Sequence, residues 1–240
     1  MQFTTTYKRR VQVIGFLFFI LGAVAHTLEL WAMYRGLRGA VILAYLILLI
    51  SFHGKQTLRP LIAFMALNSI ASFLTIGYEN EMLGQISLAT NALSFLVLII
   101  TILPKIKLRR IKPVLLIVFL ALISINGYLC YSLVDMLKPM ITSTLMLSIV
   151  YMHTLLLIVL TLAGLLYNFV FSTKASWVLT MIVLLIFFAE ILRAIGYYGI
   201  AFENVAVYLA RILTIIMGAM IIRYSFIAKT EEESLTNKVF

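Results

Sequence analysis

The sequence predicts an all-α fold: a polytopic integral membrane protein built as a bundle of eight transmembrane helices, with both termini in the cytoplasm. The first observation behind this prediction is composition, since the chain is 63% hydrophobic and only 12% charged. Soluble domains are about 45–50% apolar and about 25% charged. The second is the length of the apolar runs, such as VQVIGFLFFILGAVA and PVLLIVFLALI. A membrane β-barrel would instead show alternating segments of about 10 residues.

Polar residues divide the chain into segments that each suit one crossing of a bilayer, which needs about 20 residues. The first segment follows Lys8-Arg9-Arg10, and its apolar pattern continues to Trp31, so we expect an uncleaved helix and not a signal peptide. The later segments begin after charged or proline-containing breaks, which are Arg35, residues 55–57, 79–81 and 104–112, Lys138-Pro139, Lys174 and Glu203. The predicted helices are Val11–Met33, Gly36–Phe52, Leu58–Tyr78, Met82–Leu103, Pro113–Leu133, Met140–Leu165, Ser176–Tyr198 and Asn204–Ile227.

The connections between these segments are short, so consecutive helices are expected to pack as antiparallel neighbours. The sequence contains no convincing internal repeat or linker. We therefore predict a single transmembrane domain over residues 1–240, with a short polar tail at 229–240.

The distribution of Lys and Arg predicts the orientation in the membrane. Cytoplasmic loops carry an excess of these residues, and the side opposite the termini holds only Arg35, Arg38 and Lys138. The basic residues on the side of the termini are Lys8, Arg9, Arg10, Lys55, Arg59, Lys105, Lys107, Arg109, Arg110, Lys112, Lys174, Arg223, Lys229 and Lys238. The net charge of +10 therefore reflects topology and predicts no nucleic-acid partner. We expect a multi-pass protein of the bacterial inner membrane.

Motifs for several common chemistries are absent from the sequence. There is no HExxH or Cys/His cluster for a metal, no P-loop for a nucleotide, and no G-x-S-x-G for an esterase. The single cysteine, Cys130, excludes an internal disulfide. We therefore predict no metal site and no cofactor.

Three charged residues stand inside the last two apolar runs. Glu190 and Arg193 lie in MIVLLIFFAEILRAIGYY, and Arg211 lies in VYLARILTIIMG. Ionisable side chains at membrane depth are costly, and they mark functional sites by default. A salt bridge that only links the last two helices is an equally good interpretation, because buried charges must pair in either case.

Helical spacing and orientation place further polar residues at a similar depth, around a cavity that opens on the side opposite the termini. The predicted site residues are Glu29, His26, Asn91, Tyr128, Tyr151, Tyr208, Glu190, Arg193 and Arg211. The second helix has no polar stripe and is expected to face lipid. His153 is two residues from Tyr151, so we expect it to point away from that face and to serve packing.

Several stretches resemble the lysoplasmalogenase-like YhhN family of integral membrane proteins, as does the layout of almost the whole chain. LNSIASFLTIG is similar to the family's third helix, MLGQISLATNALSFLVLI to its fourth, and LLIFFAEILRAIGYYGIAF with VAVYLARILTIIMG to its last two. Here Ala71-Ser72 stands where the family has a Gly-Asp pair, Asn91 where it tends to have His, and Arg211 where it has Gln.

The resemblance implies hydrolysis of the vinyl ether bond of a lysoplasmalogen or a related lysolipid, with Glu190 in the place of a family Asp. Such a reaction needs an acid and a base, and Glu29 with His26 would complete the catalytic set. Arg193 and Arg211 suit the lipid phosphate. Asn91, Tyr128, Tyr151 and Tyr208 are the further candidates for substrate binding.

The alternative is a non-catalytic lipid-binding, accessory or sensory membrane protein. The absence of the family's Asp and His favours this alternative. In either case the expected partner is a membrane lipid or lysophospholipid.

Overall fold

The computed structural model describes residues 5–53, 59–106, 113–141, 143–200 and 202–236, and within these ranges the chain forms helices and no strands. The α-helices are α1 (Thr5–Thr27), α2 (Trp31–His53), α3 (Arg59–Leu74), α4 (Glu81–Ile102), α5 (Pro113–Leu137), α6 (Thr144–Phe171), α7 (Lys174–Tyr197) and α8 (Glu203–Thr236). Short 3₁₀ turns follow three of them, at Thr75–Gly77, Leu103–Lys105 and Lys138–Met140. The predicted all-α fold class is confirmed.

Eight helices of the described chain are long and apolar enough to cross a membrane, with candidate spans of 19 to 28 residues. At about 1.5 Å per residue the shortest reaches about 28 Å, close to the thickness of a hydrocarbon core of about 30 Å. The protein is therefore a multi-pass integral membrane protein, as its composition predicts.

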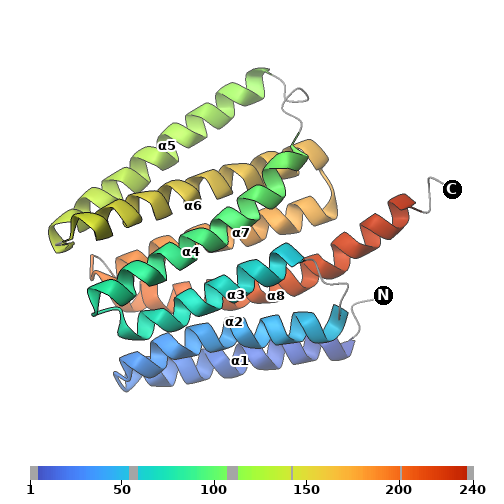
Figure 1. Cartoon of the computed structure of the whole chain (residues 1–240). Coiled ribbons are helices and arrows are strands. Elements are labelled where there is room, and N and C mark those ends of the chain that lie inside the picture. Colours follow the sequence, from blue (N-terminus) through green and yellow to red (C-terminus); the bar gives the residue numbers. More distant parts are fainter. Residues whose placement is uncertain (1–4, 54–58, 107–112, 142, 201, 237–240) are drawn as a thin grey trace.

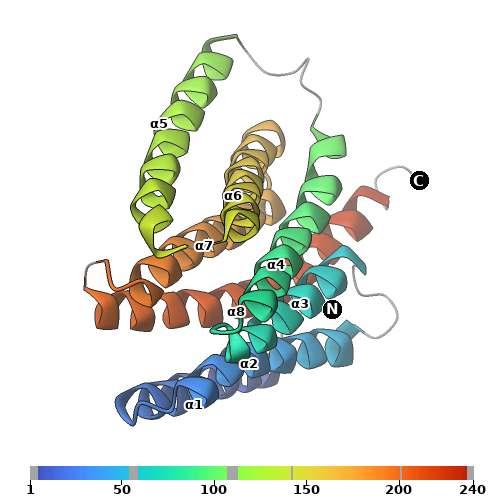
Figure 2. The same cartoon turned by 60° about the vertical axis from the view of Figure 1, so that its left-hand side comes forward.

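The helices pack as a ring with two additions. Successive neighbours in the ring are α2, α3, α4, α6, α7 and α8, and α8 closes the ring on α2. α1 packs on both α2 and α8 (Figure 1). α5 packs mainly on α6 at the edge of the bundle, and Figure 2 shows it standing apart from α4. Consecutive helices are thus packed neighbours as predicted, except at the step from α4 to α5.

Buried hydroxyl groups hold several of these neighbours together. Ser69 on α3 donates to the carbonyl of Gly39 on α2 at 3.0 Å, and Ser87 on α4 donates to Ala71 on α3 at 2.8 Å. Thr180 on α7 makes the same kind of bond to an α6 carbonyl at 2.7 Å. Such bonds stabilise helix pairs in a medium without water. These hydroxyl groups therefore serve helix packing.

The first connection differs from the prediction, which continued the first helix to Met33. α1 ends at Thr27, and Glu29 adopts the left-handed conformation with φ of 55°. The amide of Leu30 donates to the carbonyl of Ala25 at 2.8 Å, a bond over five residues that is typical of a helix C-terminus and not of a continuing α-helix. α2 therefore begins at Trp31 and not at Gly36, so Arg35 lies within the helix and not in the connection.

The two ends of the bundle differ in what they carry. The start of α1 and the end of α8 lie at one end, called the termini end here (Figure 1). The starts of α2, α4, α6 and α8 lie at the other. α8 continues to Thr236, so most of the predicted polar tail at 229–240 is helical. Of the basic residues used to predict the orientation, Lys55, Lys107, Arg109, Arg110, Lys112 and Lys238 lie outside the described residues.

Gly218 of α8 gives a test of how tightly the helices pack. A Cβ at this position would overlap the ring of Tyr45 on α2, which is 1% exposed. We expect Gly218→Ala to lower the free energy of unfolding by about 1–3 kcal/mol, because a packed interior does not accept added volume. The measurement is equilibrium unfolding in detergent micelles. Gly127→Ala is the matched control, since nothing lies within 4 Å of a Cβ there, and equal stability of the two variants would contradict this packing.

Candidate functional site

A cavity of about 600 Å³ lies within the bundle, toward the end opposite the termini. Its wall combines the C-terminal parts of α1, α3, α5 and α7 with the N-terminal parts of α2, α4, α6 and α8. Antiparallel packing explains this composition, because each connection at this end joins the end of an odd-numbered helix to the start of the next. Polar residues far apart in sequence therefore meet at one depth.

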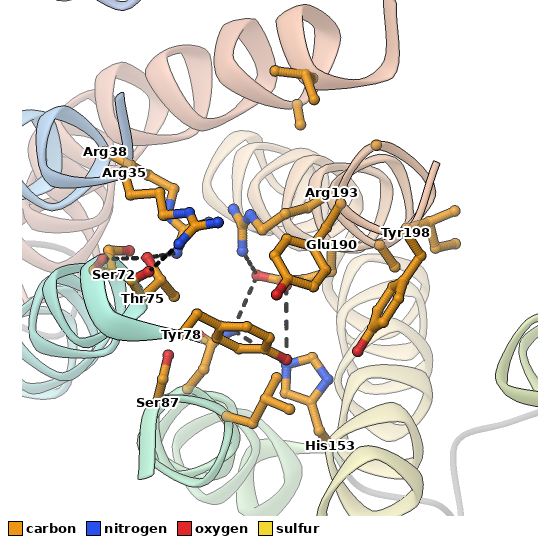
Figure 3. Close-up of a pocket in the computed structure, with 18 of the residues that line it drawn as sticks. Arg35, Arg38, Ser72, Thr75, Tyr78, Ser87, His153, Glu190, Arg193 and Tyr198 are labelled. Atoms are coloured by element: carbon orange, nitrogen blue, oxygen red, sulfur yellow. Dashed lines mark hydrogen bonds and ion pairs between the residues drawn. The ribbon is translucent and has the colours of Figure 1, made fainter. Parts of the chain in front are cut away.

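Glu190 on α7 is the buried carboxylate of the wall (Figure 3). Its Oε1 atom accepts hydrogen bonds from Arg193 Nη1 at 2.5 Å and from Asn91 Nδ2 at 3.0 Å. Arg193 stands three residues further along the same helix, so the helix itself brings the two charges together. The carboxylate is thereby ionised and paired inside an otherwise apolar bundle.

Asn91 on α4 joins Glu190 to two other helices. Its Nδ2 atom also lies 3.2 Å from His153 Nε2 on α6, and its Oδ1 atom accepts from Asn68 Nδ2 on α3 at 3.1 Å. An amide NH₂ group only donates, so this contact is a hydrogen bond when His153 Nε2 is the ring nitrogen without a proton. His153 Nε2 is 4.0 Å from Glu190 Oε2, which places imidazole and carboxylate side by side in the wall.

Two arginines enter the wall from α2. Arg38 Nη2 donates to Thr75 Oγ1 at 2.8 Å, and the Thr75 hydroxyl in turn donates to the Ser72 carbonyl at 2.6 Å. Arg35 Nη1 binds Glu79 Oε1 at 2.5 Å. Figure 3 shows Arg38 reaching from its side of the cavity toward Arg193. α2 thus faces the site, and the prediction that it faces lipid is wrong, because that prediction left Arg35 outside the helix and did not count Arg38 as a polar face.

Arg211 on α8 is 4% exposed and only partly satisfied. Its Nη2 atom donates to the Tyr34 carbonyl at 2.5 Å, and its guanidinium lies 4.2 Å from the centre of the Tyr34 ring. Its Nε and Nη1 atoms are buried without a hydrogen-bond partner among the described residues. Gly22 on α1 makes room for it, since a Cβ there would lie 3.2 Å from Nε.

The charges of the wall do not balance. The wall contains the arginines Arg35, Arg38, Arg193 and Arg211 and the acidic residues Glu79, Glu190 and Glu203. Glu79 pairs with Arg35 and Glu190 with Arg193, while Glu203 is exposed. Within the described ranges, Arg38 and Arg211 form no ion pair. The buried part of the wall therefore carries an excess of positive charge.

Residues beyond the helix ends border the cavity at the surface. Burial raises the pKa of the Tyr78 and Tyr198 hydroxyls, so both stay protonated at neutral pH. The pKa of Glu79 lies below its ordinary value, because its own backbone N–H and then Arg35 hydrogen-bond to the carboxylate. A lowered folded-state pKa adds stability above the unfolded value, and that stability disappears as the pH falls through the folded value. The Arg35–Glu79 contact is therefore intact at neutral pH and is lost in acid.

The structure brings together some of the residues predicted from sequence and leaves others apart. The predicted residues that line the cavity are Glu190, Arg193, Arg211, Asn91 and His26. His26 lies among the rings of Trp31, Tyr34 and Tyr208, at centroid distances of 4.9 to 5.4 Å. The predicted residues that are not part of the lining are Glu29, Tyr128, Tyr151 and Tyr208.

Each of these exceptions has a local cause. Glu29 is an exposed residue of the α1–α2 turn, and Tyr208 lies behind His26 with its hydroxyl 3.4 Å from Thr27 Oγ1. Tyr128 is 71% exposed, because α5 turns its polar face outward and lines the cavity with Leu133, Val134 and other apolar residues. Tyr151 is also exposed, and the residue of α6 that faces the cavity is His153.

Sequence reasoning missed His153, Arg38 and Asn68. A usable signal existed for His153, which follows the buried Val150 by three residues and precedes the buried Leu157 by four, on one helical face. The expectation that His153 points away from the site is therefore wrong. The cause is that the face was assigned from Tyr151, an exposed residue.

No family model, no curated protein and no solved structure matches the chain. The resemblance to the YhhN family therefore stays a prediction from the residues quoted above. The functional argument rests on the geometry of the cavity.

Removal of Arg193 tests the buried pair. We expect Arg193→Gln to lower the free energy of unfolding by about 3 kcal/mol, because breaking a buried ion pair from one side leaves an uncompensated charge. Glu190→Gln/Arg193→Gln should recover most of this loss, since neither charge remains. Equilibrium unfolding in micelles measures all the variants.

The matched control is Arg35→Gln, whose partner Glu79 is 66% exposed. Exposed pairs contribute about 0–1 kcal/mol, so this change should have little effect. A double variant at positions 190 and 193 that is as unstable as the sum of its single changes would contradict the pairing.

Proposed function

We propose that the protein binds a lysophospholipid, or a similar single-chain amphiphile with an anionic head, in the arginine-lined cavity. The observation that carries this proposal is the presence of Arg38 and Arg211 in the wall without a carboxylate partner among the described residues. Guanidinium groups bind phosphate oxygens through charge-assisted hydrogen bonds. A phosphate in the cavity would offer acceptors to Arg38 Nε and to Arg211 Nε and Nη1, which have no hydrogen-bond partner within the described part of the chain.

The opposite part of the wall suits a hydrocarbon chain. α5 contributes Cys130, Leu133, Val134 and Leu137, and α6 contributes Val150 and Leu157. A volume of about 600 Å³ lies within the range of about 300–1,000 Å³ that is usual for small-molecule pockets. That space favours a ligand with one chain over a bilayer lipid with two.

The distribution of basic residues supports a definite orientation. Arg35 and Arg38 belong to the cavity wall, so Lys138 is the remaining basic residue of the described connections at that end. The termini end carries Lys8, Arg59, Lys105 and Lys174. The positive-inside rule therefore favours cytoplasmic termini and a cavity on the outer side of the membrane. We propose that this membrane is the bacterial inner membrane.

Arginine variants test the binding proposal. We expect the full chain in detergent to bind lysophosphatidylethanolamine at least tenfold more tightly than a monoacylglycerol with the same chain, because the latter has no phosphate. Arg38→Gln and Arg211→Gln should each remove most of that difference, since a hydrogen bond to a charged group contributes about 1.5–3 kcal/mol. Competition binding with a labelled lysolipid measures both ligands.

Arg59→Gln is the matched control, because Arg59 is an exposed basic residue at the other end of the bundle. It should bind both ligands as the unmodified chain does. Equal affinity of the unmodified chain for the phosphorylated and the neutral ligand would sink the proposal.

A second candidate function is hydrolysis of the vinyl ether bond of a lysoplasmalogen. The observation that favours it is the position of His153 Nε2, 4.0 Å from Glu190 Oε2, with Asn91 hydrogen-bonded to Glu190 and in contact with His153. The reaction adds a proton to the alkenyl carbon and water to the resulting cation. The hemiacetal then splits into a fatty aldehyde and the free glycerol hydroxyl. A neighbouring imidazole and carboxylate can hold and transfer these protons.

Aldehyde release from a lysoplasmalogen tests this second function. We expect Glu190→Gln and His153→Gln to lower kcat by about 10²-fold or more, the usual contribution of acid–base groups. Binding of lysophosphatidylethanolamine should persist in both variants. Absence of turnover in the unmodified chain, with lysolipid binding intact, would exclude hydrolysis and leave the binding function.

A further inference from the structure

A second hollow lies outside the cavity, as a groove between α1 and α8 toward the end that carries the termini. It shares no residue with the cavity wall. Its apolar lining includes Val11, Phe16 and Phe19 of α1 and Ile212, Ile216 and Met220 of α8. Phe16 is 68% exposed, so the groove opens onto the outer surface of the bundle, where lipid lies.

Glycines and one tyrosine set the depth of this groove. Tyr45 of α2 forms its floor, and a Cβ on Gly15 of α1 or on Gly218 of α8 would overlap the Tyr45 side chain. The Tyr45 hydroxyl donates to the carbonyl of Val11 at 3.4 Å. The Tyr45 side chain is thus packed against both α1 and α8, so it does not move outward into the groove.

Positive charge is concentrated at one end of the groove. Lys8 of α1 and Arg223 of α8 both line it there, and both are exposed. Among the described residues, neither forms an ion pair and no acidic side chain lines the groove. Gln12 adds an amide one helical turn from Lys8. The groove therefore combines an apolar channel with a cationic end.

The groove is long enough to span one leaflet of a bilayer. Its lining extends from Lys8 to Phe19 on α1, which is about 16 Å at about 1.5 Å per residue, and from Ile212 to Ile227 on α8, which is about 22 Å. Half of a hydrocarbon core of about 30 Å is about 15 Å. An acyl chain laid along the groove would reach the middle of the membrane with its head group beside the two cations.

We infer that the groove binds one anionic phospholipid of the leaflet on the side of the termini. Its phosphate-bearing head lies beside Lys8 and Arg223, and an acyl chain lies over Tyr45 between α1 and α8. Basic pockets between transmembrane helices select anionic head groups through the same electrostatic attraction. A zwitterionic lipid would make the same acyl-chain contacts, but its attraction to Lys8 and Arg223 would add little affinity. This site is independent of the ligand proposed for the cavity.

Native mass spectrometry of the full chain, released from detergent micelles with added lipid, tests the inference. We expect phosphatidylglycerol to bind more tightly than phosphatidylcholine of the same chains. Lys8→Gln/Arg223→Gln should weaken phosphatidylglycerol binding roughly 30-fold, to the level of phosphatidylcholine. The matched control is Arg59→Gln/Lys105→Gln, which removes two exposed basic residues from the same end of the bundle that do not line the groove.

A groove-filling variant separates chain contacts from charge. Ala219→Trp places a bulky side chain in the lining and leaves both cations in place, so we expect it to reduce the binding of both lipids. Unchanged phosphatidylglycerol affinity in Lys8→Gln/Arg223→Gln would overturn the inference, as would an equal loss in the control variant. Dimers in the spectrum that Ala219→Trp abolishes would show that a second copy of the chain fills the groove.

Discussion

The pairing of Glu190 inside the bundle is the interaction on which the rest of the site depends. A carboxylate at membrane depth has no water to solvate it, so its partners must be supplied by the protein. Here Arg193 supplies the charge and Asn91 supplies a hydrogen bond. Asn91 in turn contacts His153 and Asn68. These contacts link α3, α4, α6 and α7, and a shift of any one of these helices would leave a buried polar group without its partner.

The arginines that face this cluster, Arg38 and Arg211, are less completely hydrogen-bonded than Glu190. Glu190 has an ion-pair partner, whereas among the described residues Arg211 has two buried nitrogen atoms without hydrogen-bond partners and Arg38 has one. Unsatisfied buried donors lower stability. Natural proteins usually retain such locally destabilising groups at functional sites. The cavity therefore combines the hydrogen-bonded cluster around Glu190 with a cationic surface, whose unsatisfied donors an anion could bind.

The sequence predicted the class of fold and part of the cavity, for reasons that are physically distinct. Apolar runs reveal membrane helices directly. The salt bridge considered for Glu190 was one between the last two helices, whereas its arginine partner, Arg193, stands three residues away on the same helix. It was harder to predict which face of each helix points to the interior and which to lipid, because both environments are apolar. On α5 the polar face, including Tyr128, lies outside, and on α6 the site residue is His153 and not Tyr151.

The error at the first turn had the largest effect on the site. Leu28, Leu30 and Trp31 continue the apolar pattern, so nothing in composition marks the turn at Glu29. The local backbone conformation decides it, and the start of α2 moves to Trp31 as a result. Trp31, Tyr34 and Arg35 then belong to α2 and line the cavity with it. Predictions about residues near a loop thus depend on a boundary that hydropathy alone does not determine.

The position of α5 has a consequence for how a ligand with a long tail exchanges with the membrane. α5 packs mainly on α6, yet its residues Cys130 to Leu137 complete the cavity wall. Separating α5 from the bundle would break few helix contacts and none of the polar network around Glu190. The wall is therefore expected to open most easily on this side, and the ligand proposed above would then pass sideways into the bilayer without its tail crossing water.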